Sequence, residues 1–212
     1  MDEPENVAIP DTLILTLTPP VDIGGATCRE VRLQEPTLVQ IQRAHEKLDN
    51  AGMSSVRAQR AYELTLLQHV SKLSPAVIDA LPARKIREGI QYLERFVTCD
   101  LPAQEWDGED IPDEVIVPLD APLTANGLEV SELALREPTG GELAKAEALL
   151  GSAMPPLPGP IRAYHLRLIC EVTGLKPGHI GQVPIRKARE AVRYLEGFER
   201  SVPTTGANSG LT

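Results

Sequence analysis

Alternating apolar and polar positions open each half of the chain. The apolar members recur with period two, at Leu13, Leu15 and Leu17 and again at Val115, Val117 and Leu119. Such alternation is typical of a strand with one buried face. A turn containing glycine follows at 24–25 and at 126–127, where positive φ angles suit a tight hairpin. A second apolar strand follows each turn, so the sequence predicts a β-hairpin in each half.

Helical spacing replaces the alternation after each hairpin. Thr37 stands three residues before Gln40, and Thr139 stands three before Glu142, which is the capping-box spacing of a helix start. Apolar residues then recur at spacings of three and four, which is the period of an amphipathic helix. We therefore expect about three α-helices after each hairpin.

The middle helix of each half is apolar on more than one face, so it is expected to be central to the fold. Its repeated leucines, Leu64 and Leu166, are expected to be buried. The connections ahead of this helix differ between the halves. Residues 51–59 contain a glycine and two serines, whereas residues 155–160 contain four prolines and are expected to form a stiff, extended spacer.

The two halves are copies of one sequence. Glu35-Pro36-Thr37 recurs as Glu137-Pro138-Thr139, and this offset of 102 residues aligns the halves without a gap. The repeat predicts an α+β fold of two tandem units, each a hairpin followed by helices. The predicted segments are an N-terminal tail (1–12), module 1 (13–98), an acidic linker (99–114), module 2 (115–200) and a disordered tail (201–212).

Charge and composition narrow the function classes. The chain carries 21 basic and 30 acidic residues, a formal net charge of −9, and this balance disfavours nucleic acid as a partner. No apolar run has the roughly 18 residues that a membrane span needs, and no signal peptide is visible. Cys28, Cys99 and Cys170 are an odd, widely spaced set, which favours reduced thiols.

Residue types that support catalysis or metal binding are not arranged for it. The four histidines do not recur at the repeat offset, and no two stand at helical metal-ligand spacing. No nucleophile elbow, phosphate loop or dinucleotide-binding motif is present. The sequence therefore predicts a protein that is not an enzyme and has no cofactor or metal.

One polar pattern does recur at the start of the last helix in each half. It comprises Arg84, Lys85 and Arg87, matched by Arg186, Lys187 and Arg189. These residues fit a solvated helix with ion pairs from Arg84 to Glu88 and from Arg186 to Glu190. They equally fit a docking surface for an acidic partner. Trp106, alone in the acidic linker, fits either a buried anchor or a partner contact.

The order of short motifs in each half resembles the phage tail assembly chaperone family found with Mu-like and P2-like tails. The motifs are Gln34-Glu35-Pro36 and Arg136-Glu137-Pro138, then Leu73-Ser74-Pro75 and Leu175-Lys176-Pro177, then Phe96 and Phe198. Family members are usually single-copy, so this chain resembles a tandem duplication.

The resemblance implies a role in the host cytoplasm before the tail polymerises. Its implied partner is the tape measure protein, with tail tube subunits as a second candidate. A fused pair of modules would raise the effective concentration of the second module once the first has bound. The alternative is a structural tail or baseplate adaptor that stays in the virion. The sequence leaves the oligomeric state open.

Overall fold

The computed structural model describes residues 9–23, 25–49, 55–101, 111–125, 127–151 and 157–200. Most of the predicted N-terminal tail, residues 102–110 of the acidic linker with Trp106, and the predicted tail from 201 to 212 lie outside the described residues.

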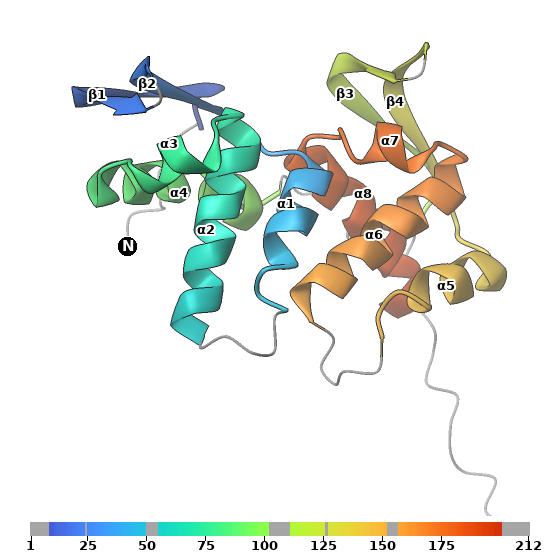
Figure 1. Ribbon diagram of the computed structural model, residues 1–212. Coiled ribbons are helices and arrows are strands. Elements are labelled where there is room, and N and C mark those ends of the chain that lie inside the picture. The colour runs from blue at the N-terminus through green and yellow to red at the C-terminus, as the bar shows by residue number, and fades with distance from the viewer. Residues whose placement is uncertain are drawn as a thin grey trace, which may run out of the picture.

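Each half folds as a two-stranded antiparallel hairpin followed by helices, as the repeat predicted (Figure 1). Module 1 contains β1 (Thr12–Ile23), β2 (Ala26–Gln34), α1 (Leu38–His45), α2 (Ser55–Ser71), α3 (Pro75–Asp79) and α4 (Ala83–Thr98). Module 2 contains β3 (Glu114–Ala125), β4 (Leu128–Arg136), α5 (Gly140–Glu147), α6 (Pro158–Thr173), α7 (Pro177–Ile180) and α8 (Ile185–Arg200). The short α3 and α7 supplement the three main helices of each module.

The hairpins bury the face that the alternation indicated. Leu15 pairs with Val31 across β1 and β2, and both side chains are buried. The register shifts between Thr16 and Val21, around two prolines that cannot donate to the ladder. Module 2 repeats the shift between Pro118 and Leu123. The two hairpins therefore shift register at equivalent positions, in the segment that ends with the proline that the repeats share, Pro20 and Pro122.

The last helix of each module is tied to the chain segment ahead of the first strand. The hydroxyl of Tyr92 donates to the carbonyl oxygen of Pro10, and that of Tyr194 donates to Pro112, both at 2.8 Å. Each tyrosine ring also meets a phenylalanine ring edge-on. The ring centroids are 5.1 Å apart for Tyr92 and Phe96 and 5.2 Å apart for Tyr194 and Phe198. The two hydroxyl bonds therefore tie α4 and α8 to the segments that lead into their hairpins, while each ring contact lies within one helix.

Two expectations from the sequence were wrong at the middle helices. Helix α6 begins at Pro158, so Pro158 and Pro160 lie in its first turn and not in an extended spacer. Proline is favoured there because the first amides of a helix have no intrahelical acceptor. Leu64 and Leu166 are only half-buried, packed at the margin of the core.

The helices of the two modules lie side by side. Helix α1 packs between α2 of its own module and α6 of module 2, and α5 packs on α6. The four helices form the row α2, α1, α6, α5, with both hairpins on the same side of the molecule (Figure 1). The row therefore ends in α2 on one flank and α5 on the other.

Replacing Leu66 should test the core of module 1. Leu66 is fully buried, so Leu66→Ala should lower the free energy of unfolding by about 2–5 kcal/mol. Leu64→Ala, on the same helix but half-buried, should cost less. Chemical denaturation measures both, and an equal or larger loss for Leu64→Ala would contradict this packing.

Candidate functional site: the contact between the modules and the two ends it leaves open

A backbone seam joins the start of α1 to the segment ahead of α8. Thr37 forms an antiparallel bridge with Pro184. The amide of Leu38 donates to the carbonyl of Val183 at 2.9 Å, and the amide of Ile185 donates to the carbonyl of Pro36 at 2.9 Å. Because backbone groups make these bonds, the seam fixes the register between the modules whatever side chains flank it.

An ion pair reinforces the seam. Glu35 accepts from the backbone amide of Arg186 at 2.7 Å and from its Nε at 2.8 Å. The Arg186 guanidinium also lies over the Phe96 ring, 5.3 Å from its centroid. Arg189 donates from Nη1 to the carbonyl oxygens of Phe96 at 3.1 Å and Cys99 at 2.9 Å. Two arginines of module 2 thus hold the end of α4.

Helix α1 approaches the start of α6 closely. A Cβ built on Gly159 would lie 2.1 Å from Oδ2 of Asp49, so a larger residue at this point of α6 would have to displace the Asp49 carboxylate. His45 stacks on Tyr62, with ring centroids 5.0 Å apart. Burial, and then the charge of Arg162, lower the pKa of His45 to about 4. His45 is therefore neutral at pH 7 where it faces a cation of the other module.

The two modules contribute different surfaces to this contact. Module 1 uses residues 35–49 and the end of α4, whereas module 2 uses the start of α6 and residues 181–189. The repeat equivalents of Glu35 and Arg186 are Glu137 and Arg84, and both are exposed. Neither side chain makes a hydrogen bond or ion pair among the described residues. The contact is therefore heterologous, and each module keeps one of its two surfaces open.

The recurrent basic residues differ between the modules in the same way: the arginines of module 2 lie in the contact and those of module 1 face solvent. Arg186 and Arg189 are engaged between the modules, while Arg84 and Arg87 are exposed with no such partner in the described part of the chain. The ion pairs along these helices run from the lysines and not from Arg84 and Arg186 as expected: Lys85 to Glu88 at 2.9 Å and Lys187 to Glu190 at 3.3 Å.

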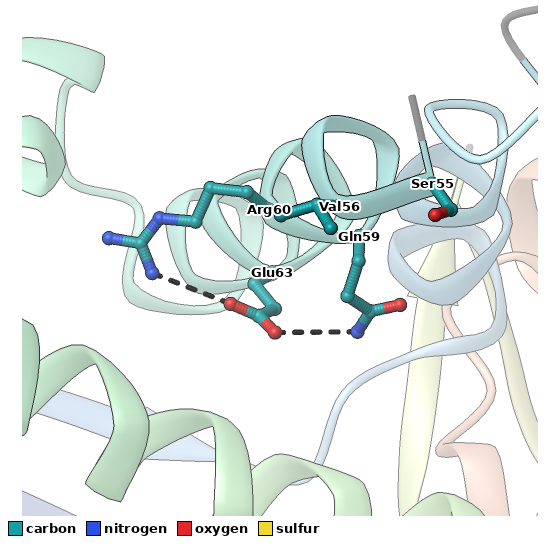
Figure 2. Close-up of a pocket in the computed structure, with 5 residues that line it drawn as sticks. All are labelled: Ser55, Val56, Gln59, Arg60 and Glu63. Atoms are coloured by element: carbon teal, nitrogen blue, oxygen red, sulfur yellow. Dashed lines mark hydrogen bonds and ion pairs between the residues drawn. The ribbon is translucent and has the colours of Figure 1, made fainter. Parts of the chain in front are cut away.

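An open pocket marks the outer flank of α2. Ser55, Val56, Gln59, Arg60 and Glu63 line it, all on the first turns of the helix (Figure 2). Glu63 accepts from Gln59 and pairs with Arg60, both at 3.4 Å. Val56 is 77% exposed. The corresponding turns of α6 are covered by α1. The pocket on α2 is therefore the equivalent surface of module 1, which no helix of this chain covers among the described residues.

Other kinds of site are not found among the described residues. No group of three or more histidine, cysteine, aspartate or glutamate side chains in the described ranges could hold a metal ion. No described helix is both long and apolar enough to cross a membrane.

Two copies of one hairpin-and-helix module define a tandem-repeat protein of the α+β class. The chain belongs to the family described as "Phage tail assembly chaperone proteins, E, or 41 or 14", whose pattern matches it twice, over residues 15–98 and 117–200. The two matches coincide with the two modules. Neither the curated proteins nor the solved structures contain a match to the chain.

Arg186 and its repeat equivalent Arg84 form a matched pair for testing the intermodule contact. Arg186→Gln leaves the half-buried Glu35 without its cation, so the free energy of unfolding should fall by about 1–3 kcal/mol. Arg84→Gln should change it by less than about 0.5 kcal/mol in dilute solution. Urea denaturation distinguishes the two, and equal losses would show that the modules do not dock through Arg186.

Acidification should loosen the contact through His45. Its pKa falls from 6.5 to about 4 on folding, so the unfolded chain binds more protons within this window. Stability contributed by the neutral side chain is therefore complete above pH 6.5 and is lost as the pH falls towards 4. The stability of His45→Gln should decline less over this range than that of the unaltered chain. Parallel stability–pH curves would contradict the assignment.

Proposed function

We propose that this tail assembly chaperone binds the tape measure protein in the host cytoplasm before the tail polymerises, with the tail tube protein as a second candidate partner. The role is binding and not catalysis. Family membership over both modules supports this proposal. A tape measure protein with exposed apolar stripes would need cover before assembly, because large apolar patches drive aggregation.

The outer faces of the two hairpins are the surfaces we assign to this partner. Ile14 on β1 is 49% exposed, and its repeat equivalent Ile116 on β3 is 59% exposed. The same position of both modules thus presents a β-branched apolar side chain to solvent, and both hairpins lie on one side of the molecule (Figure 1). This repeated exposure carries the proposal, since two exposed isoleucines held by one body give an elongated apolar partner two points of contact.

Co-expression with the tape measure protein tests the proposal. The unaltered chain should co-purify with its partner and raise the partner's soluble fraction. Ile14→Ser with Ile116→Ser should reduce both, because the repeated apolar contact is lost. The matched control, Ile14→Val with Ile116→Val, keeps β-branched apolar side chains and should retain binding.

Three outcomes would contradict the proposal or the surface assigned to it. A tape measure protein that neither co-purifies with the unaltered chain nor gains solubility would exclude the chaperone–partner pair. Stoichiometric recovery of the chain from purified virions by mass spectrometry would favour a structural tail or baseplate adaptor instead. Equal binding by the serine and valine variants would move the binding surface away from the hairpins.

A further inference from the structure

The open flanks of the molecule are complementary to each other. One flank carries the repeat equivalents of the α6 and α8 surface, including Arg84 and Arg60 of module 1. The other carries the equivalents of the α1 surface, including Glu137 and Glu147 of module 2. All four residues are exposed. From this complementarity we infer that a second copy of this chain docks head-to-tail, placing its α2 flank on the α5 flank of the first.

The ion pairs of the intermodule contact can form again between two copies. Within the chain, Glu35 binds Arg186. Their equivalents Glu137 and Arg84 keep the same charges, so the pair is conserved between copies. The cation–π contact also has its counterparts, because Phe198 stands where Phe96 stands and Arg84 where Arg186 stands.

The helix contact gains an opposite charge at the open flanks, because an acidic residue stands where the contact within the chain has a neutral histidine. Within the chain, Arg162 faces His45, which its environment keeps neutral. At the open flanks the equivalent of His45 is the acidic Glu147, and the equivalent of Arg162 is Arg60. Among the described residues, the exposed Arg60 side chain pairs with Glu63, at 3.4 Å. A carboxylate brought beside Arg60 gains an attraction that the intermodule contact lacks.

Large and small residues also trade places between the contact within the chain and the open flanks. Gly159 leaves room for Asp49 within the chain, whereas at the open flanks Arg57 occupies the Gly159 position and Gly151 occupies the Asp49 position. Similarly, a Cβ on Gly181 would lie 3.1 Å from Cβ of Val39. The equivalents of these two residues are Asp79 and Gly141 respectively. In both pairs the larger residue stands on the opposite partner, so each glycine again faces a residue with a larger side chain.

Backbone groups at the open flanks are ready for the same seam. The bonds made by the amides of Leu38 and Val39 depend on backbone position alone. Gly140 and Gly141 place the corresponding amides at the exposed start of α5. The pocket of Figure 2, on the outer flank of α2, is where the end of α5 from the neighbouring copy would sit. Heterologous contacts of this kind build a ring or an open helical array.

Charge reversal on the full-length chain tests this inference by sedimentation velocity over a concentration series. The unaltered chain should exceed the mass of one chain as concentration rises, and added salt should oppose this. Arg84→Glu and Glu137→Arg, each at an exposed position, should separately weaken association by about tenfold or more while leaving the melting temperature unchanged.

Mixing the two variants provides the decisive comparison. A chain with Arg84→Glu retains Glu137, which can pair with Arg84 of the Glu137→Arg chain, and the two reversed ends can pair with each other. An equimolar mixture should therefore regain the association of the unaltered chain. Reversal of Lys72 (Lys72→Glu), an exposed residue outside both flanks, is the control and should have no effect. A single-chain mass at every attainable concentration, association insensitive to both reversals, or a mixture without rescue would each overturn the inference.

Discussion

The whole arrangement depends on how α1 is held. This helix of eight residues packs between α2 and α6, and the segment just ahead of it forms a backbone seam with module 2. A two-stranded hairpin and a few short helices bury little apolar surface alone, so small units of this kind gain stability from a neighbour. Docking through α1 turns two small modules into one continuous core.

The contact also determines which residues remain available to partners. Arg186 and Arg189 are used inside the molecule, while the equivalent Arg84 and Arg87 face solvent. The heterologous geometry keeps both hairpins on one side and leaves the flanks of the helix row open (Figure 1). An apolar partner bound at the hairpins and a second copy bound at a flank would therefore occupy separate surfaces of the chaperone.

Much of the fold could be predicted from local pattern because local pattern reports one-sided burial. Alternation assigned Leu15 and Leu17 to the inner face of the hairpin, and both side chains are buried. The capping box at Thr139 forms as its spacing indicated, and at Thr37 the Gln40 side chain accepts from the Thr37 amide. The start of α6 was misjudged because a proline-rich stretch suits both an extended spacer and the first helical turn, and only packing against α1 separates the two.

The intermodule contact could not be predicted in this way. Arg84 and Arg186 stand at the same position of one polar motif, yet one is solvated and the other is paired. Heterologous docking places equivalent residues of the two modules in different surroundings. The signal that could have revealed it lies in the differences between the repeats. Val39 against Gly141, and Asp49 against Gly151, change size at positions that face the other module.

Hydrogen exchange at single amides tests the heterologous contact most directly. In dilute solution the amides of Leu38, Val39 and Ile185 should exchange slowly, because each donates across the seam. Their repeat equivalents, Gly140, Gly141 and Ala83, should exchange fast at the exposed starts of α5 and α4. Equal protection of the two sets, whether fast or slow, would contradict a contact in which the two modules present different surfaces.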